Sequence, residues 1–383
     1  MKKATRQQTK QHNYRLVLKT VYDHTDLSRA DVARITRLTR TTVSDIVSGL
    51  IEQDLLEERG LGESAGGKPP ILLSVKNDAR QVVCLDLSNH FFRGALVNLR
   101  GEISSQISLP VESPMGERAL ACVYELIDRL TLAATAPIAG IGIGSPGLVD
   151  AHGGVIRRAV NLGWIDLPLK SLLEGRYRLP IYIANDSQTA ALAEFTFGAG
   201  KEASNLVVIK VGQGIGSGIV LQGQLHYGDG FGAGEIGHLK VVEDGAQCSC
   251  GNTGCLETVA SQRAILQRAC EARDGAISPS FPEVVQAYRA GDARIRELVC
   301  QAGQALGISI ANLVGILNIH HIVISGGLQA FGEPLLEAAR NELPSRVLST
   351  MAAETKISYS TLGEDNVILG ASALVLSREF GLV

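Results

Sequence analysis

The chain has 383 residues, of which 45% are hydrophobic, and this length favours a small domain joined to a larger, two-lobed one over a single core. No run of about 18 apolar residues is available to span a bilayer, and no apolar stretch follows the basic N-terminus as a signal peptide requires, so we expect a cytoplasmic protein without membrane insertion. Three of the seven cysteines fall within eight residues, a spacing typical of a metal site rather than of a disulfide framework.

The formal charge of −3 is unevenly distributed. Residues 1–40 contain ten Lys or Arg and three Asp, a balance of +7, which leaves −10 for the rest of the chain. Because phosphate contacts dominate nucleic-acid affinity, a basic N-terminal region indicates a polyanionic partner. The alternative is a solvated basic tail.

Three short helices are predicted near the N-terminus. Apolar residues at helical spacing indicate the first over residues 13–22. Ser28 caps the second, with Asp31 in the capping-box position, and Thr39 caps the third. One apolar stripe follows the third helix, formed by Val43, Ile46, Val47, Leu50 and Ile51. This arrangement predicts a helix-turn-helix.

Two strands, at residues 55–59 and 71–75, are expected to pair around the glycine-rich loop 60–70 as a wing. Lys68 at its tip suits a minor-groove or phosphate contact, although an ordinary hairpin loop would look the same. Residues 1–75 are therefore predicted to be a winged helix-turn-helix domain that binds double-stranded operator DNA.

The third helix carries the residues expected to meet DNA bases. Four side chains lie off its apolar stripe and would face the major groove: Arg40, Thr41, Ser44 and Ser48. A helical bundle that only mediates dimerisation is the alternative.

From residue 82 onward, apolar β-runs alternate with helices, which predicts an α/β domain over residues 76–383. The expected strands are 82–87, 94–98, 138–142, 181–184, 206–211, 218–221 and 321–324. Trp164, the only tryptophan, is expected either to line a binding cleft or to anchor the core.

One histidine and three cysteines have the spacing of a closed, tetrahedral metal site. The candidate ligands are His238, Cys248, Cys250 and Cys255. Four protein ligands leave no open position for a catalytic water, so the prediction is a structural Zn²⁺. Buried free thiols are the alternative.

Four features of the chain carry a family resemblance: the glycine-rich segment 211–219, Gly228, the Gly-Glu-Ile-Gly-His motif at 234–238 and the cysteine knuckle at 248–255. In these features the chain resembles the ROK family of repressors and sugar kinases. The resemblance covers essentially the whole chain. With the N-terminal helix-turn-helix, the chain is similar to bacterial glucose, xylose and N-acetylglucosamine repressors. The resemblance implies an actin-like (ribonuclease H-like) ATPase-type domain of two lobes, a sugar in the cleft, and a homodimer or homotetramer.

The resemblance also implies which residues hold the sugar hydroxyls: Asn185, Asp186, Glu235, His238 and Glu257. Carboxylates and amides suit this role because they pair with adjacent hydroxyls. His238 would bind zinc through one ring nitrogen and sugar through the other. For Asn185 and Asp186, simple helix capping is the alternative.

In the family kinases, the residue at the position of Asp186 is the general base. Their first phosphate loop has the pattern Asp-x-Gly-Gly-Thr, whereas residues 86–90 here are Asp-Leu-Ser-Asn-His, which argues against nucleotide binding. We therefore expect a sugar-responsive repressor of carbohydrate genes and not an enzyme. The alternatives are an ATP-dependent hexose kinase that carries a DNA-binding domain, and a zinc-stabilised DNA-binding protein without a ligand.

Overall fold

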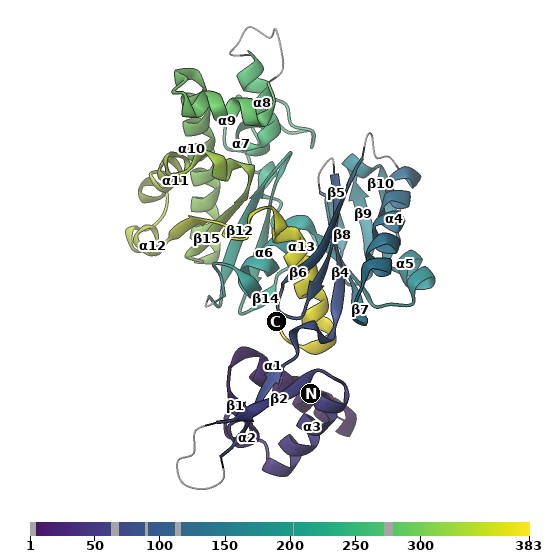
Figure 1. Ribbon diagram of the computed structural model, residues 1–383. Helices are drawn as coiled ribbons and strands as arrows, with labels where there is room; N and C mark the ends of the chain where they lie inside the picture. The colour runs from purple at the N-terminus through teal and green to yellow at the C-terminus, as the bar shows by residue number, and fades with distance from the viewer. Residues whose placement is uncertain (1–4, 63–68, 89–90, 112–115, 202, 272–278) are drawn as a thin grey trace.

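The computed structural model describes residues 5–62, 69–88, 91–111, 116–201, 203–271 and 279–383. Figure 1 shows a small N-terminal unit below two larger β-sheets with their helices. The elements up to Val75 are called the head, and those after it the body.

The head contains three helices and a small sheet. The helices are α1 (Arg6–Asp23), α2 (Arg29–Thr36) and α3 (Arg40–Glu52). The strands β1 (Leu27–Ser28), β2 (Leu56–Leu61) and β3 (Ile71–Val75) form an antiparallel sheet in the order β1-β3-β2. The predicted caps Ser28 and Thr39 are confirmed, since their side chains accept hydrogen bonds from the amides of Asp31 and Thr42. The wing tip with Lys68 lies outside the described residues.

Helix α1 begins seven residues before its predicted start. Thr5 and Gln8 form a capping box, in which each side chain accepts a hydrogen bond from the other residue's backbone amide. In α3, the predicted stripe packs inward: Val43, Val47 and Leu50 are fully buried, and Ile46 and Ile51 pack partly against the same core.

The body contains two five-stranded sheets with the same plan. The first sheet has the order β11-β7-β4-β5-β6 and the second β14-β13-β12-β15-β16. In each, the strand that comes first in the chain is central, with an antiparallel meander on one side and two parallel strands on the other. The first sheet consists of β4 (Gln81–Asp86), β5 (Phe91–Asn98), β6 (Ile103–Pro110), β7 (Ile138–Ser145) and β11 (Ile181–Asn185). The second consists of β12 (Leu206–Val211), β13 (Ile215–Leu221), β14 (Gln224–Leu225), β15 (His321–Gly326) and β16 (Lys356–Tyr359).

Two helices hold the sheets together. Helix α6 (Asp186–Phe197) follows the last strand of the first sheet, α13 (Asn366–Val375) follows the last strand of the second, and the two pack against each other (Figure 1). Their contact is so close that a Cβ on Gly370 would lie 1.8 Å from the carbonyl oxygen of Thr189. Only glycine fits at this crossing.

The remaining elements cover the sheets or extend them. A third body sheet is formed by β8 (Leu148–Asp150), β9 (Val155–Ala159) and β10 (Trp164–Leu167). The other helices are α4 (Glu117–Ala133), α5 (Leu169–Tyr177), α7 (Glu257–Ala260), α8 (Gln262–Glu271), α9 (Phe281–Arg289), α10 (Ala293–Leu317), α11 (Glu333–Arg340) and α12 (Ser349–Glu354).

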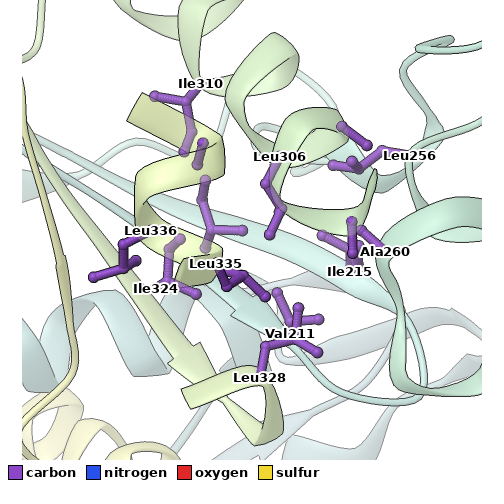
Figure 2. Packing of buried hydrophobic residues seen from close by; sticks show 14 of the residues in the cluster. Val211, Ile215, Leu256, Ala260, Leu306, Ile310, Ile324, Leu328, Leu335 and Leu336 are labelled. Carbon is purple, nitrogen blue, oxygen red and sulfur yellow. The ribbon is translucent and has the colours of Figure 1, made fainter. Parts of the chain in front are cut away.

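Separate apolar cores lie on the two sheets. Figure 2 shows part of the second, where Val211 and Ile324 from the strands pack near Leu306 and Leu335 from helices α10 and α11. Trp164 belongs to the first core, where it is 4% exposed and its Nε1 donates to the carbonyl of Gly116 at 2.9 Å. It therefore anchors the core.

The head packs directly on the body. Their buried residues form one continuous cluster, which includes Val17 and Leu18 of α1 with Val97 and Ile368 of the body. At its rim, the Arg100 guanidinium lies 3.9 Å from the ring centroid of Tyr22 and donates to the Tyr22 carbonyl at 2.8 Å.

The C-terminus also holds the head. The Arg15 side chain donates to the carbonyl of Arg378 at 2.6 Å, and the Lys19 ammonium donates to that of Leu382 at 3.1 Å. Figure 1 shows the C-terminus beside α1. The segment Leu376–Phe380 has π-helical hydrogen bonding. It is therefore part of the surface of the body that contacts the head.

Among the described residues, one helix is long and apolar enough to cross a membrane by length and composition alone. This helix is α10, and 56% of its most apolar window is buried inside the body. A central helix of a folded core passes the same test, so this is weak evidence for a membrane span.

Candidate functional site

The structure brings the four predicted metal ligands together. One donor atom from each of His238, Cys248, Cys250 and Cys255 lies within 4.8 Å of every other. The sulfur atoms of Cys250 and Cys255 are 3.7 Å apart, and that of Cys248 is 3.6 Å from Nδ1 of His238. Tetrahedral zinc with bonds of about 2.3 Å places its sulfur ligands about 3.8 Å apart, so this donor set could hold a metal ion.

Tight turns produce this convergence. Isolated bridges join Lys240 to Cys255 and Gln247 to Thr253, which fold the segment back on itself. Gly254 has a φ of +71°, and a Cβ there would lie 1.8 Å from the carbonyl oxygen of Val242. The fold of the knuckle thus requires glycine at this turn.

His238 connects the metal cluster to the predicted sugar residues. Its Nδ1 faces Cys248, while its Nε2 lies 4.0 Å from the Glu235 carboxylate. The charges of Asp186 and Glu257 also act on Glu235, whose side chain is 48% exposed. Three of the other predicted sugar residues therefore lie within electrostatic reach of Glu235.

Asn185 caps α6. Its Oδ1 accepts hydrogen bonds from the amides of Ser187 at 2.8 Å and Gln188 at 3.3 Å, and its Nδ2 donates to the Gly147 carbonyl at 2.9 Å. The structure therefore shows Asn185 capping α6, and its contact with a sugar stays a prediction. The same bonds fix Asp186, the next residue, at the end of strand β11.

Glu257 is already engaged by two protein groups. One carboxylate oxygen accepts from the Ile215 amide at 3.1 Å, and the other accepts from Arg263 at 2.8 Å. Glu257 and Arg263 also line a pocket of about 880 Å³ beside the knuckle, with Cys248 among the other lining residues. A ligand at Glu257 would have to share these oxygens.

The glycine-rich segment before and within β13 serves close packing. A Cβ on Gly216 would lie 2.5 Å from Oγ of Ser187, and one on Gly214 would lie 2.5 Å from a Glu257 oxygen. These glycines let the strand approach both α6 and Glu257, so the motif positions two of the predicted sugar-binding regions against each other.

A largely buried ion pair beside this site was not predicted from the sequence. The Lys210 ammonium donates to Oδ2 of Asp186 at 2.7 Å, and the two side chains are 13% and 14% exposed. Burial alone would lower the pKa of Lys210, but the carboxylates of Asp186 and Asp86 outweigh it and raise that pKa. A single lysine within the apolar strand β12 was the available signal, since lysine is almost never buried without a partner.

Four of the five residues predicted to contact DNA lie on α3, and the fifth, Lys68, lies outside the described residues. Arg40, Thr41 and Ser48 are exposed, and Ser44 is partly buried. Arg40 is the first helical residue, and Ser44 and Ser48 follow at intervals of four, which places these three on one face.

The ROK family model matches residues 82–378 of this chain. The chain belongs to the ROK family.

Both regulators and kinases are similar to this ROK protein. A xylose repressor of Caldicellulosiruptor bescii is 34% identical over 96% of each chain. The crystal structure of a ROK family transcriptional regulator, a homologue of the E. coli MLC protein, matches 98% of both chains with a TM-score of 0.87 and 27% identity. A glucokinase of Halalkalibacterium halodurans is also 34% identical and is matched over 96% of its own length, but it covers only 78% of this chain. The regulators therefore match more of the chain than the kinase does, and the α/β body has the actin-like fold that the family shares.

Proposed function

We propose that this ROK protein is a sugar-responsive transcriptional repressor of genes for carbohydrate uptake or metabolism. The observation that carries the proposal is the likeness to a xylose repressor over 96% of both chains, head included. In this proposal, residues 1–75 bind the operator and residues 76–383 bind the sugar. The protein acts in the cytoplasm and is not inserted in a membrane.

Operator recognition is assigned to the head. Helix α3 enters the major groove, where Arg40 contacts guanine and Thr41, Ser44 and Ser48 contact bases or phosphates. Lys68 contacts the minor groove or a phosphate. The exposed positions of Arg40, Thr41 and Ser48 support this arrangement.

Sugar binding is assigned to Asn185, Asp186, Glu235, His238 and Glu257. The supporting observation is the grouping of Asp186, His238 and Glu257 around Glu235. A structural Zn²⁺ held by His238, Cys248, Cys250 and Cys255 would fix the imidazole with its second nitrogen directed toward Glu235.

Sugar binding is coupled to operator binding by closure of the two lobes. In a homodimer or homotetramer, closure changes the spacing of two heads and hence operator affinity, a coupling typically of about 1 to 3 kcal/mol. The continuous core between head and body supports this transmission.

An ATP-dependent sugar kinase is the second candidate, favoured by the likeness to a glucokinase. In that case Asp186 would be the general base. Against it, Ser88 stands where a kinase loop has glycine, and its amide and hydroxyl both donate to the Asp86 carboxylate.

Operator binding in the presence of sugars distinguishes these functions. The purified protein is titrated at fixed salt with labelled DNA from upstream of its gene, alone and with D-xylose, D-glucose or N-acetylglucosamine. If the protein is a repressor, it is expected to bind this DNA specifically, and one sugar should change the affinity several-fold. Sugar-dependent ADP formation from ATP and Mg²⁺, abolished in Asp186→Ala, together with no specific DNA binding, would establish the kinase. Specific binding to DNA, without thermal stabilisation of the protein by any monosaccharide, would indicate a zinc-stabilised DNA-binding protein that has no sugar ligand.

A further inference from the structure

Lys210 is a largely buried cation that belongs neither to the metal cluster nor to the residues assigned to sugar binding. It stands near the carboxyl end of β12, the central strand of the second sheet, and Asp86 ends β4, the central strand of the first. Asp186 begins α6, directly after β11. The matching plan of the two sheets thus brings one lysine and two aspartates to the carboxyl ends of strands, where α/β sheets bind ligands.

Asp86 is buried and the Asp186 side chain is 14% exposed, so both carboxylates are largely shielded from water. Asp86 is 3% exposed and accepts hydrogen bonds from the amide and the hydroxyl of Ser88, and burial raises its pKa. The Lys210 charge lowers the same pKa, while the charge of Asp186 raises it further, so all three groups interact. Lys210 supplies the compensating charge from within the chain.

A divalent cation would compete for the same position. Mg²⁺ and Mn²⁺ bind carboxylate oxygens, and phosphoryl transfer from ATP uses such an ion beside the phosphates together with a carboxylate free to accept the hydroxyl proton. Here the ammonium occupies one oxygen of Asp186 at 2.7 Å and the Ser187 amide donates to the other at 2.9 Å. The carboxylate can still accept a hydrogen bond from a sugar hydroxyl, but a second cation would meet the charge of Lys210.

We propose that Lys210 is a built-in cation that takes the place of a divalent metal at the Asp186 carboxylate, so that the site accepts an uncharged hydroxyl and excludes metal-bound phosphates. The sugar part rests on the proposed function. The exclusion of metal does not, because it follows from the three charged groups alone.

Binding of Mn²⁺ tests this proposal. The full-length, zinc-loaded protein is titrated with Mn²⁺ and free ion is measured by electron paramagnetic resonance. Lys210→Met is expected to gain an Mn²⁺ site at least ten-fold tighter than any Asp186-dependent binding by the natural protein. The added substitution Asp186→Asn removes the gain. Lys201→Met, at an exposed lysine, is the matched control and gains nothing.

Two outcomes would overturn the proposal. One is Mn²⁺ binding by the natural protein that Asp186→Asn abolishes, a comparison that does not depend on the folding of a Lys210 variant. The other is a folded Lys210→Met variant that gains no Mn²⁺ site. If Lys210→Met does not fold, it is replaced by Lys210→Gln, which keeps a hydrogen bond to Asp186 without the charge. The same gain of Mn²⁺ binding is expected of that variant. Since neither DNA nor sugar enters the assay, its failure is distinct from failure to bind an operator.

Discussion

Arg40 is exposed at the first position of α3, where a guanidinium can reach a base edge without displacing the helix. A bidentate contact to guanine contributes about 1 to 3 kcal/mol of discrimination, so Arg40→Ala is expected to weaken specific operator binding by roughly ten-fold or more and non-specific binding much less. Fluorescence anisotropy with operator and scrambled DNA at one salt concentration measures both. Arg118→Ala, at an exposed arginine of α4, should change neither. Equal losses on the two DNAs would make Arg40 a phosphate contact.

The residue scale also shows what local spacing can and cannot predict. His238 and the three cysteines were identifiable because a zinc ligand set has a compact sequence pattern, and the structure brings them together. The pair Asp186–Lys210 is separated by 24 positions and joins the first residue of helix α6 to strand β12, so no local pattern marks it. Asn185 was identified as a candidate ligand, and the structure shows it also capping α6.

At the scale of elements, the metal knuckle is expected to be a separable unit of stability. Without the proposed Zn²⁺, three cysteines would crowd around His238, so segment 238–256 should lose its order and the candidate sugar site should lose its fixed imidazole. Cys250→Ser, in the cluster, is expected to lower zinc content and sugar-induced thermal stabilisation. Cys300→Ser, at an exposed cysteine of α10, should retain both. Full zinc content in Cys250→Ser, by a colorimetric chelator, would contradict the assigned ligand set.

The crossing of α6 and α13 is the second element-scale test. Gly370→Ala places a methyl group against the Thr189 carbonyl, and because backbone must move, we expect a loss of about 1 to 3 kcal/mol in unfolding free energy. A Cβ on Gly175 in α5 would meet no atom within 4 Å, and the φ of this residue is negative, so Gly175→Ala should instead stabilise by about 0.5 to 1 kcal/mol. Urea titrations of both variants give the comparison. Equal changes in the unfolding free energy of the two variants would show that helix propensity, and not close packing at the crossing, determines the effect of the added methyl group.

The sequence predicted elements best where the signal was local. Ser28 and Thr39 were identified because caps are read within four residues. Strand β6 was missed because half of its residues are exposed and several are serines, which weakens the apolar pattern of a buried strand. The likeness of the two sheets was not visible in the sequence, since strand order depends on pairing between distant segments.

For the whole molecule, the joint core predicts that head and body stabilise each other. Arg100 belongs to the body but stacks on Tyr22 of α1, so Arg100→Ala is expected to destabilise the head by about 1 to 2 kcal/mol. Hydrogen exchange should show faster exchange in α1, with little change in the second sheet. Arg289→Ala, at an exposed arginine of α9, is the control. Unchanged protection of α1 would mean that the head stands independently of this contact.

The junction between head and body has a consequence for the DNA. Strand β3 ends at Val75 and β4 begins at Gln81, with one turn of 3₁₀ helix, Asn77–Ala79, between them. The head and the body are therefore joined by a short, structured connection and not by a flexible linker. In a dimer, two heads held this firmly can match only one helical phase of the duplex. Inserting one base pair between the half-sites rotates one of them by about 35° relative to the other, and inserting a full turn restores the phase. Operator affinity should therefore fall and return with a period of about 10.5 base pairs.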